Sequence, residues 1–99
     1  MLASDLPRAR RAYASQKCSA RCRRVTFTMS FEEWCAFWAI EDRWNRRGRG
    51  GDRLVMARHG DAGAYAIENV FVCTFVENNR SARPQYWLPF PAQQLAFAL

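Results

Sequence analysis

Hydrophobic and polar positions in the N-terminal part of the chain follow two different periods. Over residues 5–23, small and apolar side chains recur at intervals of three and four, which predicts a helix, and Pro7 suits its first turn. The predicted apolar stripe of this helix consists of Ala9, Ala12, Tyr13, Cys18 and Cys22. The next segment, VTFTMS over 25–30, alternates apolar and polar residues. This period of two predicts a short, half-buried strand.

A dense aromatic segment follows, and a capping box marks its start. Ser30 and Glu33, three residues apart, can each accept a hydrogen bond from the other's backbone N–H, which is typical of a helix start. We therefore predict a helix from about Phe31 to Asn45. Its apolar face is wide and consists of Phe31, Trp34, Phe37, Trp38, Ile40 and Trp44. So wide a face favours a hydrophobic core over a platform for stacking bases.

The second half of the chain predicts a strand, a turn, a strand and a short helix. After the glycine-rich basic loop RRGRGGDR, the strands are expected at 54–57 and 69–74, joined by the turn-rich HGDAGAY. Thr74 and Glu77 form a second capping box, which opens a helix over 75–83. The predicted fold class is α+β. An N-terminal helix, a short strand and a helix precede a ββα hairpin–helix unit at about 54–83.

The chain of 99 residues is predicted to form one domain over residues 1–83. The segment 84–99 is apolar, and we expect it to pack on the domain or on a partner. Its large apolar side chains are Tyr86, Trp87, Leu88, Phe90, Leu95, Phe97 and Leu99. No apolar run approaches the ~20 residues of a membrane span. The first residues also lack the apolar stretch of a signal peptide, so a cytoplasmic protein is predicted.

Charge changes this picture, because the formal net charge is +6 and 14 of the 15 basic residues are arginine. The basic residues form two blocks, over 1–24 and over 46–58, separated by a net acidic segment. Such blocks favour a polyanion partner, most often nucleic acid, over a merely soluble arginine-rich surface. The residues predicted to bind nucleic acid are Arg46, Arg47, Arg49, Arg53 and Arg58.

The four cysteines do not form a CxxC pair. Cys18 and Cys22 are four residues apart, which on a helix places both on one face. A second half of a zinc site at suitable spacing is not visible, so structural zinc is not expected. Free, buried thiols are the prediction for all four cysteines, since free cysteine is among the most buried residue types.

The stretch MARHGDAGAYAIENVFVCTFVENNR, over 56–80, combines the only histidine, a glycine-bearing turn and two asparagines. With its predicted strand–turn–strand–helix order, it resembles the ββα-metal motif of HNH endonucleases and is most similar to small phage-type HNH-like proteins. The resemblance covers roughly residues 22–80. The residues that carry it are Met56, Arg58, Gly60, Asp61, Gly63, Tyr65, Asn69, Val70, Thr74, Glu77 and Asn78. Asn69 and Asn78 have the spacing that the family shows between its asparagine and its last metal ligand.

The resemblance implies a metal-dependent nuclease centre. In the family, a histidine activates water, a divalent metal neutralises charge on the scissile phosphate, and an asparagine orients the histidine. Carried over to this chain, these functions imply catalytic roles for His59, Asn69 and Asn78. They also imply a divalent metal, Mg or Mn, near Asp61 and Asn78.

The chain departs from the family's pattern at the catalytic base. Arg58 fills the position of the first histidine, and His59 comes one place later. Adjacent strand residues face opposite sides, so His59 would point away from the site unless the strand ends or bulges there. An arginine cannot act as a base near neutral pH, but it can bind a phosphate. The catalytic set is therefore degenerate, and the sequence leaves enzymatic activity open.

Each of these residues also has a structural interpretation. His59 can be a loop histidine, and Asn69 can brace the turn through a hydrogen bond to the backbone. Arg58 can form a salt bridge with Asp61 or Glu68. The second asparagine of the motif can be an ordinary exposed helix residue.

Two functions from different classes follow. The first is a nucleic-acid-binding protein, with DNA favoured over RNA, on a degenerate HNH-like scaffold that retains or has lost metal-dependent nicking activity. The alternative is a phage-encoded inhibitor that binds a host defence complex such as a CRISPR effector. In that case the arginine blocks meet the partner and the apolar tail anchors it. The tail can also support a homodimer, and a phage protein would act in the host cell cytoplasm.

Overall fold

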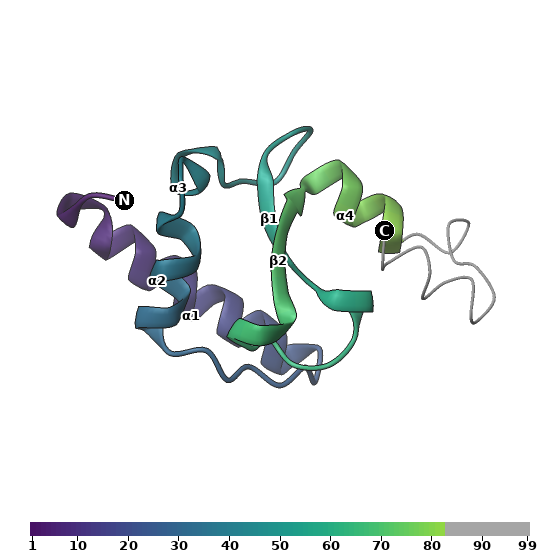
Figure 1. Ribbon diagram of the computed structural model, residues 1–99. Helices are drawn as coiled ribbons and strands as arrows, with labels where there is room; N and C mark the ends of the chain where they lie inside the picture. The colour runs from purple at the N-terminus through teal and green to yellow at the C-terminus, as the bar shows by residue number, and fades with distance from the viewer. Residues whose placement is uncertain (83–99) are drawn as a thin grey trace.

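The computed structural model describes residues 1–82, which form a mixed helix-and-strand, α+β fold (Figure 1). The elements in chain order are η1 (Ala3–Asp5), α1 (Leu6–Cys22), α2 (Phe31–Ala39), α3 (Arg43–Arg46), β1 (Leu54–Arg58), η2 (His59–Asp61), η3 (Ile67–Asn69), β2 (Val70–Thr74) and α4 (Phe75–Ala82). Within the described residues, no helix combines the length and the apolar character needed to cross a bilayer. The apolar segment 84–99, and the contacts predicted for it, lie outside the described residues.

The ββα unit has the predicted order. β1 and β2 pair as an antiparallel ladder that runs from Leu54 opposite Thr74 to Arg58 opposite Val70. α4 begins directly after β2 and packs against both strands. The predicted capping box is present at its start: Thr74 N donates to Glu77 Oε1 at 3.0 Å, and Glu77 N donates to Thr74 Oγ1 at 3.1 Å.

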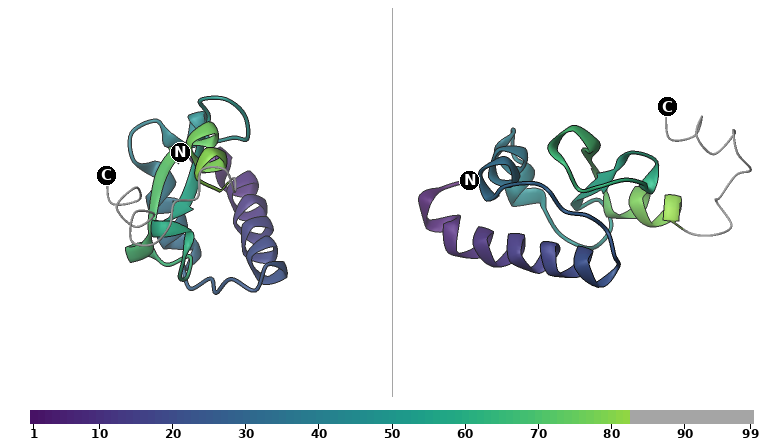
Figure 2. Two further views of the ribbon diagram at one scale, coloured as in Figure 1. Left: turned by 90° about the vertical axis from the view of Figure 1, so that its right-hand side faces the viewer. Right: turned by 90° about the horizontal axis from the view of Figure 1, so that it is seen from below.

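The core lies where α1 crosses α2 and the hairpin. Trp34 and Trp38 of α2 are fully buried, which confirms that the aromatic face forms a core. Ile40 was predicted on the same face but is exposed, because α2 ends at Ala39. Figure 2 shows that α1 runs along one edge of the molecule and that α2, α3 and the hairpin all lie on the same side of this helix. α1 approaches closely because its contact positions include Ala9 and Ala20, both completely buried. Gln16 joins the layers, since it accepts a hydrogen bond from Trp34 Nε1 at 2.9 Å.

The predicted apolar stripe of α1 is wrong at its second half. Cys18 and Cys22 are exposed, so they are neither part of the core nor the buried thiols that were expected. The inward line of α1 instead continues through Gln16 to Ala20. The sequence pattern did not reveal this line, because it contains a polar residue. Gln16 can lie in it because its side chain accepts a hydrogen bond from the indole of Trp34.

The predicted strand over 25–30 reduces to a single bridge between Phe27 and Tyr65. Thr28 N donates to Tyr65 O at 3.0 Å, and Tyr65 N donates to Thr26 O at 2.8 Å. Burial alternates along this segment as predicted, with Met29 in the core. The predicted alternation of burial is therefore confirmed, but the predicted strand is not, because within residues 1–82 the segment pairs only with Tyr65.

The predicted helix over 31–45 is broken in two, although its capping box is present at Ser30 and Glu33. Ile40 has an extended backbone and Glu41 has a positive φ of 51°. The break turns Trp44 back onto Trp34, with ring centroids 6.2 Å apart. This aromatic contact is non-local, so helix periodicity alone could not reveal it.

Candidate nucleic-acid interface

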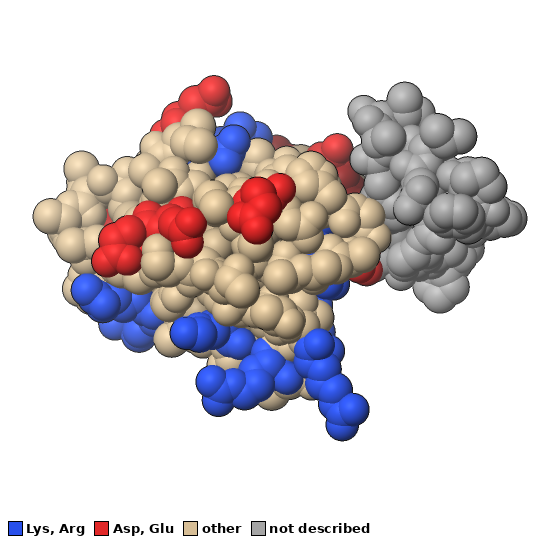
Figure 3. Space-filling view, turned by 60° about the horizontal axis from the view of Figure 1, so that its bottom comes forward, with Lys and Arg blue, Asp and Glu red and all other residues tan. Residues whose placement is uncertain are grey.

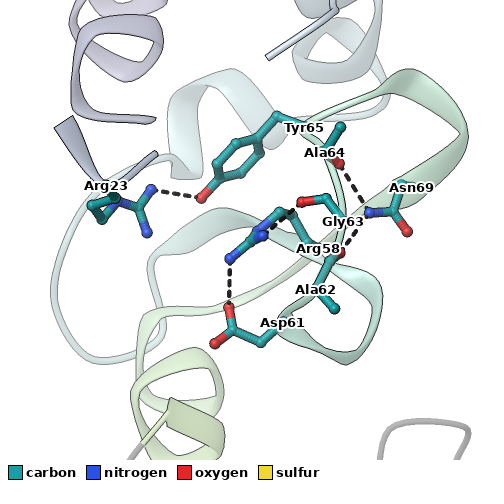
Figure 4. Close-up of polar contacts among 8 residues, drawn as sticks. All are labelled: Arg23, Arg58, Asp61, Ala62, Gly63, Ala64, Tyr65 and Asn69. Carbon is teal, nitrogen blue, oxygen red and sulfur yellow. Dashed lines mark hydrogen bonds and ion pairs between the residues drawn. The ribbon is translucent and has the colours of Figure 1, made fainter. Parts of the chain in front are cut away.

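The turn between β1 and β2 is held from two sides by side chains that the sequence singled out (Figure 4). Arg58, the last residue of β1, donates from Nη1 to the carbonyl of Gly63 at 2.7 Å. Asn69, directly before β2, donates from Nδ2 to the carbonyls of Ala62 and Ala64, each at 2.9 Å. Arg58 thus holds the middle one of three consecutive carbonyls, and Asn69 holds its two neighbours. Asn69 therefore braces the turn.

Arg58 is engaged by its own fold. Its Nη2 lies 3.2 Å from Asp61 Oδ1, and its side chain is only 10% exposed. The centre of its guanidinium group lies 5.3 Å from the ring centroid of Tyr65. Of the two ion pairs that the sequence allowed, the structure contains the one with Asp61. In this arrangement Arg58 stabilises the turn and has little surface left to offer a phosphate.

Tyr65 connects the turn to the end of α1. Its ring is almost completely buried, and its hydroxyl accepts a hydrogen bond from Arg23 Nη2 at 3.0 Å. Figure 4 shows Arg23 at the hydroxyl end of Tyr65 and Arg58 nearer its ring. Arg23 was not among the predicted binding residues, because only the fold brings it beside the turn.

His59 and Asn78 have different surroundings. His59 is exposed and stacks on Phe71, with ring centroids 4.8 Å apart. Phe71 pairs with Ala57, so its side chain lies on the face opposite to Arg58. Asn78 of α4 lines a cleft together with Val55 and Met56, neighbouring residues of β1 whose side chains lie on opposite faces. Within residues 1–82, no hydrogen bond joins the predicted base to the last predicted ligand.

The two predicted metal ligands, Asp61 and Asn78, also differ in their contacts. The Asp61 carboxylate is paired with the Arg58 guanidinium, whereas Asn78 faces a cleft lined by arginines. Nowhere in residues 1–82 do three or more His, Cys, Asp or Glu side chains form a group that could hold a metal ion. These donors do not fit a divalent cation as they stand. The metal site and the catalytic roles of His59, Asn69 and Asn78 stay predictions, and no chemical step is assigned to them.

A cleft of about 860 Å³ lies between α1 and the ββα unit. One wall is the side of α1 that carries Ser15 and Ser19, and the other includes Asn78 and Asn79 of α4. The described lining contains no Asp or Glu. It does contain three arginines, which are Arg23, Arg47 and Arg49.

A second basic region covers the outside of α1. In Figure 3, Lys and Arg side chains gather along the edge formed by this helix, apart from the Asp and Glu side chains in the same view. Five exposed basic residues of this region have no ion pair within the described residues, and we call them the basic helix surface: Arg10, Arg11, Lys17, Arg21 and Arg24. Residues 6–31 contain no Asp or Glu, so nothing in this segment offsets their charge.

The sequence contained a signal for this surface that the site prediction missed. Arg10, Lys17 and Arg21 stand at i, i+7 and i+11, which places them on one flank of a helix. Charge density alone had directed the prediction to the 46–58 block instead.

The structure divides the five arginines predicted to bind nucleic acid. Arg46 and Arg49 are exposed, and their side chains form no hydrogen bond or ion pair within residues 1–82. Arg53 is exposed, and its side chain donates one hydrogen bond, to the carbonyl of Asn45 at 3.0 Å. Arg47 and Arg58 are half-buried, and each lies over an aromatic ring. Three of the five are thus exposed, Arg58 is held by the turn, and Arg47 lies over the core at the wall of the cleft.

Comparison with known proteins found no matching family model, no matching curated sequence and no matching solved structure. The HNH-like assignment therefore stays a prediction.

Proposed function

We propose that this protein binds nucleic acid, DNA in preference to RNA, through the basic helix surface and the exposed arginines of the 46–53 loop. The observation that carries the proposal is the basic helix surface, which presents five cations and no carboxylate within its segment. Cations on a protein surface release counterions from the phosphate backbone when they bind, and this release drives sequence-independent affinity. Arginine is suited to the task because its planar fork matches phosphate geometry.

The proposed scaffold is HNH-like with a degenerate catalytic set. The order β1, turn, β2, α4 supports this proposal, and so does the asparagine that ties the turn in front of β2. The preference for DNA rests on the same resemblance. We place binding ahead of cutting, because His59 stacks on Phe71 while Asn78 faces the cleft. Residual nicking is tested by incubating supercoiled plasmid with the protein and Mg²⁺ or Mn²⁺, with His59→Ala as the comparison.

The alternative predicted from the sequence is an inhibitor that binds a host defence complex. It depends on the segment 84–99, which lies outside the described residues, so nothing in the structure favours it over nucleic-acid binding. We further propose a cytoplasmic location, because the exposed thiols of Cys18 and Cys22 suit a reducing compartment.

A pair of variants tests the proposed surface. The double substitution Arg21→Gln and Arg24→Gln removes two cations that have no partner within the described residues. The matched control, Arg8→Gln with Arg43→Gln, removes the same charge from residues engaged by Asp5 and by the Phe37 carbonyl. Fluorescence anisotropy with a labelled duplex should show clearly weaker binding for the first variant and near wild-type binding for the control. Equal losses in the two variants would mean that net charge, and not this surface, sets the affinity.

A further inference from the structure

Arg47 holds an unusual position at the edge of the core. Its guanidinium carbon lies 5.5 Å from the ring centroid of Trp34 and 5.3 Å from that of Trp38, so the cation rests on two buried indoles. It lines the cleft between α1 and the ββα unit. Its side chain has neither a hydrogen-bond partner nor a carboxylate partner within residues 1–82.

Two N–H groups at this place lack an acceptor. Arg47 Nε and Trp38 Nε1 are both buried without a hydrogen-bond partner among the described residues. Both belong to residues that line the cleft. Buried donors without acceptors are rare in folded proteins, because such a group loses its hydration and gains nothing in return. Arg47 Nε and Trp38 Nε1 are themselves enclosed, so a ligand in the cleft would contact the part of the Arg47 side chain that meets the cleft.

The electrostatics favour a negatively charged acceptor. Desolvation lowers the pKa of the Arg47 guanidinium, and the neighbouring positive charge of Arg49 lowers this pKa further. The cation is thus held where its charged form is disfavoured. The lining offers no Asp or Glu to neutralise it. An anion bound in the cleft would offset both the desolvation of the Arg47 cation and its repulsion by Arg49.

The shape of the cleft limits the kind of nucleic acid that can reach this place. Its walls are the helices α1 and α4, and its volume is about 860 Å³. A double helix, whose major groove alone is about 12 Å wide, cannot enter a space of this size. A single strand can, and proteins bind single strands by combining a basic groove with aromatic residues. Ser15, Ser19, Asn78 and Asn79 add neutral hydrogen-bonding groups along the walls.

We infer that the cleft binds a phosphate group of a single nucleic-acid strand, with Arg47 as the main ligand and with Arg49 and Arg23, which also line the cleft, as further ligands. This inference rests on the proposed nucleic-acid binding and adds a second site to it. The basic helix surface takes duplex backbone, and the cleft takes an unpaired strand. Arg47 is then kept over Trp34 and Trp38 for ligand binding, at some expense to the stability of the free protein.

The test uses the full chain labelled with ¹⁵N, and it follows the tryptophan indole N–H signals by NMR. Inorganic pyrophosphate and a short single-stranded oligothymidylate should each shift the Trp38 signal, because the Arg47 cation lies on that ring. The Trp44 signal, which belongs to a residue outside the cleft lining, should move much less. A blunt duplex should bind without shifting Trp38.

Two single substitutions complete the test. Arg47→Gln should weaken oligothymidylate binding by about tenfold or more, since it removes a charged phosphate ligand. It should leave duplex binding and the melting temperature close to those of the wild type. Arg43→Gln is the matched control, because Arg43 also lies over a buried ring, that of Phe37, but lies outside the cleft lining. A purely structural Arg47 would instead lower the melting temperature and leave single-strand affinity unchanged.

The outcomes separate this inference from the proposed function. Duplex binding with a Trp38 signal that ignores both pyrophosphate and oligothymidylate overturns the cleft site and leaves the helix surface standing. A Trp38 response without duplex binding supports the cleft and overturns the helix surface. Equal single-strand affinity in Arg47→Gln and Arg43→Gln also overturns the inference. If Arg47→Gln does not fold, the wild-type titration decides the question.

Discussion

At the scale of single residues, the turn between β1 and β2 depends on Asn69. Its Nδ2 group donates to two carbonyls, and Gly63 lies so close that an added Cβ would be 3.0 Å from that nitrogen. Asn69→Ala should lower the free energy of unfolding by about 1–3 kcal/mol, because both carbonyls lose their donor. Urea unfolding measures this. Asn79→Ala is the control, and it should stay within about 0.5 kcal/mol of the wild type.

If Asn69 braces the turn, its loss should lower stability. If it orients a catalytic histidine, its loss should lower activity. An Asn69→Ala protein of unchanged stability that has lost a nicking activity would contradict the bracing role. The sequence could offer both roles but could not choose between them, because the choice depends on which carbonyls face the amide. The ion pair of Arg58 could not be chosen from the sequence either. Asp61 and Glu68 were equal candidates, and only the structure shows Asp61 beside the guanidinium group.

The four cysteines should differ in reactivity. Burial, with the nearby Glu77 charge, raises the pKa of the Cys73 thiol to about 11, and burial also raises the pKa of Cys35. Cys18 and Cys22 are exposed. At pH 8 iodoacetamide should therefore alkylate Cys18 and Cys22 first, because the thiolate is the reactive form. Peptide mass spectrometry over time measures the four rates, and a Cys73 that reacts as fast as Cys18 would refute its protected environment.

The raised pKa of Cys73 also sets a pH dependence. The folded thiol keeps its proton at a pH where the unfolded thiol, with a pKa of about 8.5, has lost it. Its contribution to stability is therefore complete below that pH and declines as the pH rises toward about 11. Cys73→Ser should flatten the loss of stability over this interval in urea unfolding at several pH values. A slope identical to that of the wild type would show that Cys73 does not titrate there.

At the scale of elements, the capping boxes are the features that the sequence predicted best. Ser30 Oγ accepts from Glu33 N at 3.1 Å, and the Thr74 box has nearly the same geometry. Ser30→Ala and Thr74→Ala should each destabilise the fold by about 0.5–2 kcal/mol, because helix N–H groups lose their acceptor. Thermal unfolding measures this, with Thr28→Ala as an exposed control outside any helix. Unchanged melting in both capping variants would refute their role.

Elements that depend on distant partners were predicted less well. A capping box is local, so four residues of sequence contain it. The end of α2 is different, because the chain leaves the helix so that Trp44 can contact Trp34. The segment 25–30 likewise has strand-like burial but finds only Tyr65 to pair with. In α1, Gln16 interrupts the apolar line that one-dimensional periodicity would need to see.

At the scale of the whole molecule, the fold sorts the basic residues into three environments. Some are exposed on α1 and in the 46–53 loop, some line the cleft, and Arg58 is engaged by the turn. The sequence predicted a basic protein and a polyanion partner from charge blocks. It could not predict which arginines are open to a ligand, because that depends on how α1 packs against the hairpin.

Binding of nucleic acid is the central claim, and its salt dependence is the most direct measurement. If about four residues of the basic helix surface meet phosphates, a plot of log Kd against log salt concentration should have a slope magnitude of about 3 to 4 for duplex DNA. Affinity should fall as salt rises. The Arg21→Gln and Arg24→Gln protein should lose about 2 from that slope, at about 0.9 per contact, and the Arg8→Gln and Arg43→Gln control should lose almost nothing. A slope near zero, or no binding at low salt, would contradict the account.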